Sequence, residues 1–238
     1  MRAISKWLSA AVVALCVACG SSAAAAYEQT HSATQIVSDA SKSTGSATSF
    51  HLAVSVTTQE GQANADFDVE GKNVSGKVTY QSTLVRVMHV DGRTFVYGTD
   101  MAQLLEKTNA QAAAIVRAKA ADKWVLMPEE FWSSTGIDEL TDLRKMADCL
   151  QAASGLKKKG TSTVSGKRAV EVDDQLTSQI YVDTASPHYF LRIVLAGSDT
   201  CVTGSAVSNE TLDLSKVGQK MNISVPNGYV DLQTLATG

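Results

Sequence analysis

The sequence predicts an α+β protein built around an antiparallel sheet. Over residues 49–98 apolar and polar side chains alternate, as where Phe67 stands between Asp66 and Asp68. A period of two is typical of antiparallel strands that are apolar on one face and wet on the other. Apolar residues at helical spacing in 100–116 and 137–153 predict helices inserted between strands. Roughly 200 to 250 residues are common for a single domain of this kind.

The first half of the chain is expected to contain one helix and then a meander of strands. The helix covers 33–43 and ends at Thr44-Gly45, where glycine can adopt the left-handed capping conformation. Asp91-Gly92 is a strong signal for a hairpin turn. The five strands are expected at 49–56, 63–71, 74–81, 83–90 and 93–98.

The second half is expected to alternate between helices and strands. A helix begins at Asp100 as its N-cap and continues to Val116. Another runs from Ile137 to Ala153, with Gly155 as its stop. Strands are expected at 123–128, in a hairpin over 160–174 that turns at Ser165-Gly166, and at 178–184, 188–195, 201–208 and 220–226.

The N-terminus carries an export signal. Arg2 and Lys6 precede an apolar run that ends near Val17, and this run is shorter than the ~20 residues needed to span a bilayer. These features are typical of a secretory signal peptide, which we place at 1–18. The mature chain then has 19 Lys and Arg against 24 Asp and Glu, a formal charge of −5. This charge argues against a nucleic-acid partner.

Cys19 is the expected site of lipid attachment. It follows Ala18 and precedes Gly20, which resembles the bacterial lipobox, in which a cysteine is acylated with chains such as palmitate and becomes the new N-terminus. Cys16 stands where a lipobox usually has leucine, a departure from the pattern. We expect an acylated tether over 19–30 and a single domain over 31–238. The alternative is cleavage after the alanines at 23–26, which would give a secreted protein.

Two further cysteines remain in the mature chain, Cys149 and Cys201. In an oxidising compartment an even count favours one disulfide, which would stabilise the fold by roughly 2 to 5 kcal/mol. The alternative is two separate buried thiols.

The order of these elements resembles a known family. The chain is similar to proteins of the LolA/LolB-like fold, and specifically to the LppX/LprG type of actinobacterial cell-envelope lipoproteins. The resemblance implies an incomplete antiparallel half-barrel whose concave face is covered by helices and holds a lipid or acyl chains. It is carried by "SATSFHLAVSV" at 46–56, "HVDGRTFVYG" at 89–98, "ADKWVLMP" at 121–128, "SQIYVDTASPHYFLRI" at 178–193 and "LDLSKVGQKMNISVP" at 212–226.

The expected ligand-binding side chains are apolar or aromatic. All but one lie on expected strands, and the exception lies on the helix that begins at Asp100. For each of them the alternation favours an ordinary core residue over a ligand contact, since a filled and a half-filled barrel share the same alternation. Phe131-Trp132 is expected either to form a lid or to anchor a loop. The candidates are Leu52, Val54, Phe67, Val69, Val78, Tyr80, Phe95, Tyr97, Leu104 and Trp124.

The sequence predicts a binding protein, not an enzyme, and no cofactor or metal. It has no G-x-S-x-G nucleophile motif, and its four histidines lack a metal-ligand spacing. We expect a lipoprotein anchored to the outer face of the cell membrane through Cys19, carrying a lipid or another apolar ligand and engaging an envelope transport or membrane protein. The alternative is a structural or regulatory lipoprotein whose packed barrel serves as a protein-docking module.

Overall fold

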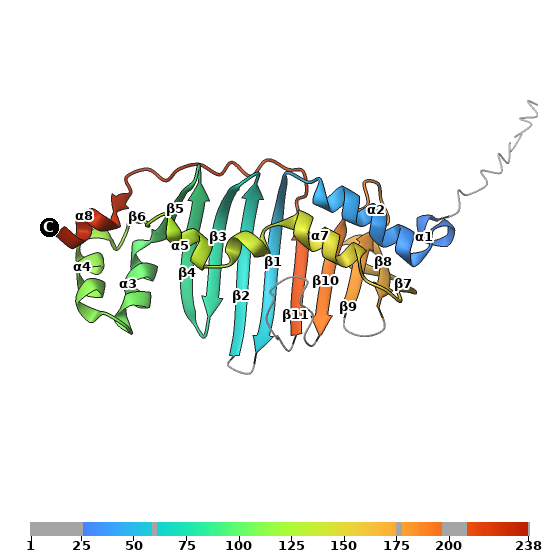
Figure 1. Cartoon of the computed structure of the whole chain (residues 1–238), viewed down its shortest axis with the longest axis horizontal. Coiled ribbons are helices and arrows are strands. Elements are labelled where there is room, and N and C mark those ends of the chain that lie inside the picture. The colour runs from blue at the N-terminus through green and yellow to red at the C-terminus, as the bar shows by residue number, and fades with distance from the viewer. Residues whose placement is uncertain (1–25, 59–60, 175–177, 197–208, 238) are drawn as a thin grey trace, which may run out of the picture.

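The computed structural model describes residues 26–58, 61–174, 178–196 and 209–237. The first half of the chain forms the expected meander (Figure 1). Two of its turns, Gln81-Ser82 and Asp91-Gly92, have both residues at positive φ, the geometry that matches the twist of a two-residue hairpin. The strands are β1 (Ser49–Thr58), β2 (Gly61–Glu70), β3 (Asn73–Tyr80), β4 (Thr83–Val90), β5 (Arg93–Tyr97) and β6 (Trp124–Leu126).

The second half of the chain supplies the other strands, and here one predicted strand is absent from the described structure. The predicted strand at 201–208 lies outside the described residues. The predicted strand at 220–226 is wrong: this segment pairs with none of the described strands and passes along their ends (Figure 1). There the N–H groups of Met221 and Asn222 donate to Glu70 Oε2 at 3.2 and 3.1 Å. The strands are β7 (Lys157–Val164), β8 (Lys167–Asp173), β9 (Ser178–Asp183), β10 (Phe190–Ala196), β11 (Asn209–Ser215) and β12 (Val230–Asp231).

The described strands form one sheet in the order β12-β6-β5-β4-β3-β2-β1-β11-β10-β9-β8-β7. All neighbouring strands are antiparallel except β12 and β6, which are parallel. The sheet does not close, because β12 and β7 are its two edges. The predicted fold class is therefore confirmed: an α+β protein with a large open antiparallel sheet and helices.

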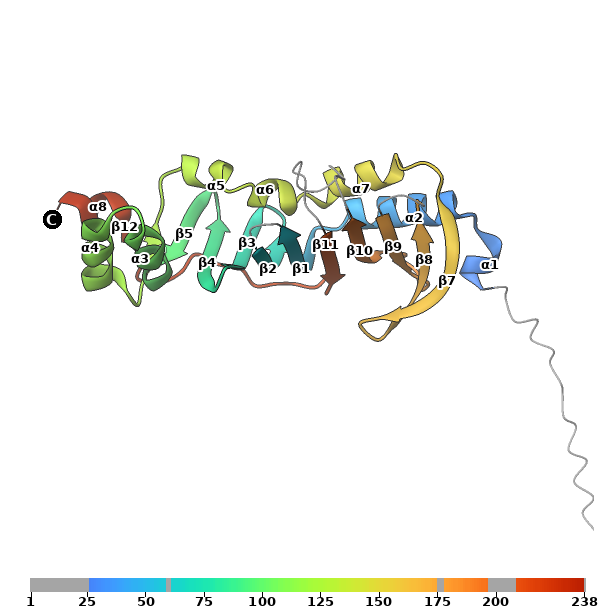
Figure 2. The ribbon, with the colours of Figure 1, turned by 90° about the horizontal axis from the view of Figure 1, so that it is seen from below.

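Four of the helices lie along one face of the sheet (Figure 2). We call this face the helix-covered face. The helices are α1 (Tyr27–Thr30), α2 (Ala33–Gly45), α3 (Gly98–Glu106), α4 (Ala110–Ala120), α5 (Glu130–Ser134), α6 (Ile137–Leu140), α7 (Leu143–Gln151) and α8 (Leu232–Thr237). Those on the helix-covered face are α2, α5, α6 and α7. No helix in the described part of the chain is long and apolar enough to cross a membrane.

Two predicted helices are each broken by a residue that caps a new helix. Asn109 separates α3 from α4, and its side chain accepts a hydrogen bond from the N–H of Ala112 at 3.0 Å. Asp142 separates α6 from α7, and its Oδ1 accepts from the N–H groups of Arg144 and Lys145, both at 3.1 Å. A capping side chain satisfies N–H groups that lack an intrahelical partner, so it favours a helix start at these points.

Asp100, the predicted N-cap, instead lies inside α3. Asp100 is 3% exposed. Its carboxylate accepts hydrogen bonds from the backbone N–H, Nε and Nη2 of Arg86, all at 2.8 Å. The predicted cap is therefore wrong. The carboxylate fastens α3 to β4 through a bidentate ion pair.

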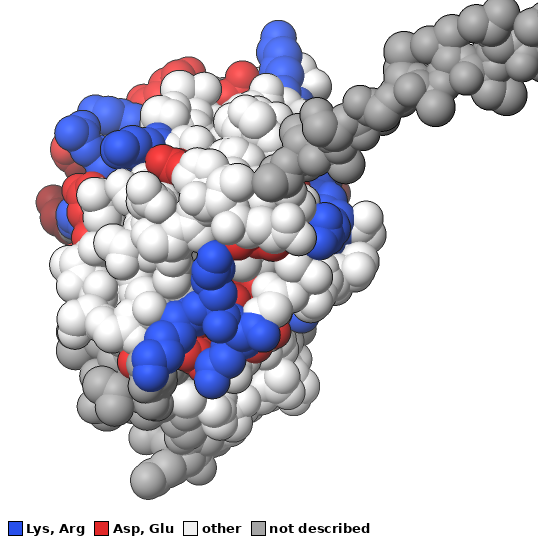
Figure 3. Space-filling model, turned by 90° about the vertical axis from the view of Figure 1, so that its right-hand side faces the viewer, with Lys and Arg blue, Asp and Glu red and all other residues white. Residues whose placement is uncertain are grey.

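Part of the predicted tether is packed on the body. Tyr27–Thr30 forms α1, and the ring of Tyr27 stacks on His188 with centroids 3.7 Å apart. Lys158 Nζ donates to the backbone carbonyls of Glu28 and His31 at 2.7 and 2.8 Å. Figure 3 shows Lys and Arg side chains gathered at this end of the molecule.

Candidate functional site

The strand register places six of the candidate residues on the helix-covered face. Leu52 pairs with Phe67, and Val54 pairs with Ala65. Ala65 pairs in turn with Val78. Val69 and Tyr80 lie in the same alternating positions of β2 and β3. Because side chains two apart point to the same face, the sheet brings these candidates together.

A glycine makes room for the largest of these side chains. Gly76 on β3 pairs with Phe67 on β2. A Cβ at this glycine would lie 2.5 Å from Phe67 Cδ1 and 2.1 Å from the carbonyl oxygen of Asp66. The ring of Phe67 therefore occupies the position that a side chain at residue 76 would take, and Phe67 is fully buried.

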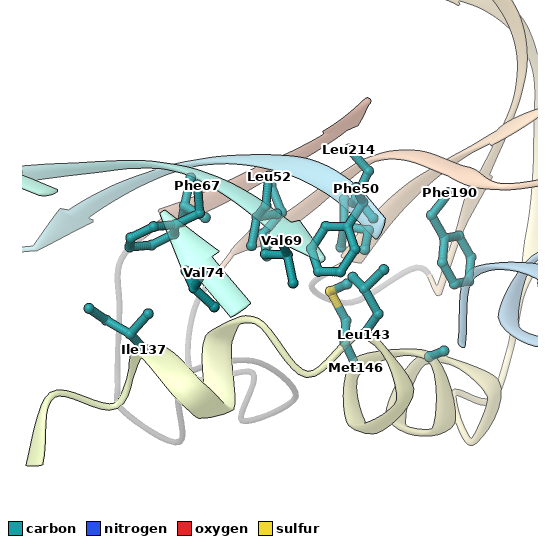
Figure 4. Packing of buried hydrophobic residues seen from close by; sticks show 14 of the residues in the cluster. Phe50, Leu52, Phe67, Val69, Val74, Ile137, Leu143, Met146, Phe190 and Leu214 are labelled. Carbon is teal, nitrogen blue, oxygen red and sulfur yellow. The ribbon is translucent and has the colours of Figure 1, made fainter. Parts of the chain in front are cut away.

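A belt of three short helices, α5 to α7, crosses the strands on this face (Figure 1). We call it the helix belt. It buries apolar side chains unevenly: α7 buries four residues, whereas α6 buries Ile137 and α5 buries none. Figure 4 shows Ile137, Leu143 and Met146 directed from the belt toward the strands. Two openings flank the belt, one on each side.

The first opening, which we call the apolar opening, is a cavity of about 180 Å³. It lies between the belt and strands β1 to β3. Val54, Phe67 and Val78, three of the predicted ligand contacts, line it. Ala65 and Leu140 also line this cavity but were not predicted as contacts. Small alanines at inward positions of β2 were the available signal, because they leave space beneath a helix.

The second opening, which we call the charged opening, is a cavity of about 430 Å³. Its apolar residues are Phe50, Val69, Val74, Leu143 and Trp132. Its charged residues are Lys72, Arg144, Lys145, Asp138 and Asp142. These charges could not be grouped from the sequence, since they come from a strand turn and from two helices.

Packed side chains separate the two openings. Leu52 and Phe67 are 0% exposed, and Ile137 is 9% exposed. Figure 4 shows Ile137 near Phe67 and Val74, with Leu143 near Phe50. A chain long enough to occupy both openings therefore requires the belt to shift away from the sheet.

An aromatic stack holds α5 at the charged opening. Trp132 stacks on His89 of β4, with ring centroids 4.3 Å apart. His89 Nδ1 lies 2.9 Å from Thr94 Oγ1. Burial lowers the pKa of His89 from its ordinary value, an effect opposed by the negative charge of Asp138. Phe131 and Trp132 are both half-buried against the core, so this pair anchors a helix that also borders the opening.

Four of the predicted ligand contacts lie elsewhere. Phe95, Tyr97 and Trp124 project from the opposite face, because they alternate with the helix-facing Val96 and Val125. Tyr229 contacts the edge of the Phe95 ring, with centroids 5.1 Å apart. Leu104 is on α3 and is 39% exposed. Tyr80, although on the helix-covered face, is also 39% exposed, at the end of β3.

The predicted attachment and disulfide residues are described only in part. Cys149 lies on α7 and is half-buried. Cys19 and Cys201 lie outside the described residues. Within the described ranges, no three His, Cys, Asp or Glu side chains are close enough together to hold a metal ion.

Comparison with known proteins supports the fold. No family model and no curated protein sequence matches the chain. The structure is similar to LprF from Mycobacterium bovis, with a TM-score of 0.55 and 14% identity over 82% of this chain and 96% of that one. The chain thus has the LolA/LprG-like half-barrel fold that the sequence resemblance implied.

Two further solved structures match less well. MucB gives a TM-score of 0.31 with 14% identity, covering 82% of this chain and 60% of that one. A DUF1329 family protein from Desulfovibrio piger gives 0.27 with 9% identity, covering 81% and 93%. Neither superposes well enough to bear on the fold or the site.

Proposed function

We propose that the protein is an exported lipoprotein that binds and carries a lipid or another apolar molecule on the helix-covered face of its half-barrel. The observation that carries this proposal is the apolar opening between the helix belt and strands β1 to β3. Its lining combines strand and helix side chains, among them Val54, Phe67 and Leu140. Ligand sites are commonly concave and mostly apolar, and this one faces the core of an unclosed sheet.

The belt provides a physical route to a larger site. Its α5–α6 part contributes a single fully buried residue, Ile137, with Phe131, Trp132 and Leu140 partly buried. Fewer buried side chains must therefore be uncovered to shift this part than to shift α7, which buries four. An alkyl chain that takes the place of the α5–α6 part is stabilised by ~0.8 kcal/mol of burial free energy for each CH₂ group that it buries. A chain of several CH₂ groups would therefore offset the contacts that the belt loses. The resemblance to LppX/LprG-type lipoproteins implies the same class of ligand.

The test is lipid retention by the mature chain, residues 19–238, exported with Cys19→Ser so that no anchor is attached. Native mass spectrometry and lipid extraction should reveal a bound lipid. Ala65→Phe should abolish it, because the new ring fills the apolar opening from β2. Ala53→Phe is the matched control, since this half-buried alanine lies on the neighbouring strand β1 but points to the opposite face.

Three outcomes are informative. Loss of lipid only in Ala65→Phe, with unchanged circular dichroism, supports the proposal. Equal loss in both variants contradicts the assignment of the site. A wild-type chain that neither retains nor takes up lipid contradicts lipid carriage and favours the alternative, a packed module that docks a protein partner.

We also propose that Cys19 carries the lipid anchor. One acyl chain holds a protein to a membrane only marginally, whereas two or more hold it stably. Cys19→Ala should therefore move the protein out of the membrane fraction. If the variant stays in that fraction, the anchor is elsewhere.

The disulfide between Cys149 and Cys201 remains a proposal as well. It would link α7 to a segment that precedes β11. Peptide mapping without reduction should yield one cross-linked peptide containing both residues. Recovery of two alkylated thiols would contradict it.

A further inference from the structure

The charged opening gathers cations from separate parts of the chain. Lys72 lies in the turn between β2 and β3, and Arg144 and Lys145 lie in the first turn of α7. All three side chains are exposed. Among the described residues, none of the three has a carboxylate within ion-pair distance. Other cations of the molecule are paired in this way, as Arg86 is with Asp100 and Arg192 is with Asp213.

The carboxylates of the same opening do not cancel these charges. Asp142 is occupied as the N-cap of α7, where its Oδ1 accepts two backbone N–H groups. Asp138 is exposed on α6. Burial lowers the pKa of His89, which favours its neutral form. The lining therefore has three positive and two negative side chains, and one of the negative charges already has hydrogen-bond donors.

Buried apolar side chains form the floor below these cations. Phe50 is 3% exposed, Val69 2%, Val74 3% and Leu143 4%. Val69 is two residues from Phe67, which lines the apolar opening. The same face thus has positive charge at the rim of the charged opening and, beneath the belt, a row of packed apolar side chains that extends to the apolar opening.

We propose that the charged opening binds the anionic headgroup, of the phosphate class, of an amphiphile whose alkyl chain extends beneath the helix belt toward the apolar opening. This inference rests on the proposed function and specifies the ligand class of that site. An exposed ion pair contributes little singly. Three cations around one multivalent anion, next to an apolar surface, together favour a charged amphiphile over an uncharged one.

The experiment compares two probes with the same acyl chain on the unanchored mature chain. Lysophosphatidylglycerol is anionic, and the corresponding monoacylglycerol is uncharged. Both are titrated below their micelle concentrations and followed by native mass spectrometry. We expect the anionic probe to bind at least ~10-fold more tightly, as summed interactions of this kind allow.

The test variant is Lys72→Gln, Arg144→Gln and Lys145→Gln combined. It should remove the preference for the anionic probe and leave binding of the uncharged probe unchanged. The control combines Lys107→Gln, Lys119→Gln and Lys123→Gln. These three lysines are equally exposed but lie on or near α3 and α4, away from both openings. The control should retain the preference.

The outcomes separate this inference from the proposed function. If both probes bind equally and Ala65→Phe abolishes both, the headgroup site is wrong and lipid carriage stands. If neither probe binds, lipid carriage fails and the headgroup site fails with it. If inorganic phosphate displaces the anionic probe at an equal concentration, the anion alone provides the affinity and the amphiphile is excluded.

Discussion

The two parts of the helix belt cover the same sheet but differ in how firmly they are packed. In α7, Leu143, Met146, Ala147 and Leu150 are buried, and the helix lies beside α2. In α5 and α6 only Ile137 is buried, and openings lie on both sides. One layer of helices thus has two differently packed parts: the α7 part closes the core, and the α5–α6 part covers the strands where we propose that the ligand binds.

The largest expected contrast is in stability. Leu150 on α7 is 1% exposed, so Leu150→Ala should lower the free energy of unfolding by ~2 to 5 kcal/mol through lost burial and a cavity. Leu140 on α6 is only partly buried, and Leu140→Ala should cost no more than about 1 to 2 kcal/mol. Urea denaturation measures both. Equal costs would show that the two parts of the belt are packed alike.

A second contrast is expected in local opening. Amides of residues 130–140 should exchange hydrogen faster than those of 143–151, because few buried contacts hold the first segment. Trp132→Ala removes the stack on His89 and should speed exchange in 130–140 further, with a stability cost of about 1 kcal/mol. Exchange in 143–151 should not change. A uniform increase over both segments would mean that the belt opens as one unit.

The smallest expected effect is a dependence on pH. Burial lowers the pKa of His89 in the folded protein below the ordinary 6.5, so the unfolded chain binds the proton more readily. The contribution of neutral His89 to the free energy of unfolding is fully present above pH 6.5. It is lost as the pH falls from there through the pKa of His89 in the folded protein. His89→Phe keeps an aromatic ring against Trp132 but cannot titrate. Its unfolding free energy should therefore fall less below pH 6.5, and an identical fall would exclude His89 as a source.

Most strands could be predicted because their signals are local. Alternation and turn residues such as Asp91-Gly92 and Ser165-Gly166 act over a few positions, and both turns adopt positive φ. The helix breaks at Asn109 and Asp142 were missed, because apolar spacing continues across each of them. Segment 220–226 was wrongly predicted as a strand, because its backbone N–H groups donate to the side chain of Glu70, far away in the sequence.

The sequence pattern identified side chains that share a face of the sheet, but it placed some residues of the opposite face in the candidate site as well. Alternation shows which side chains of one strand share a face, but it does not show which of the two faces the helices cover. Phe95 and Tyr97 were therefore grouped with Leu52, although they lie on the other face. Tyr229, distant in the chain, contacts Phe95, and the guanidinium of Arg86 on the neighbouring strand β4 lies 3.7 Å from the ring centroid of Tyr97.

The open sheet has a further consequence at its β7 edge. Within the described residues β7 pairs only with β8, so one side of its backbone could accept a strand from another molecule. Lys157, Lys158 and Lys159 begin this strand, and its register shifts between Lys158 and Gly160. Lysines and bulges at an edge disfavour strand addition. The open sheet is thereby disfavoured from pairing with a second copy of the chain through its β7 edge.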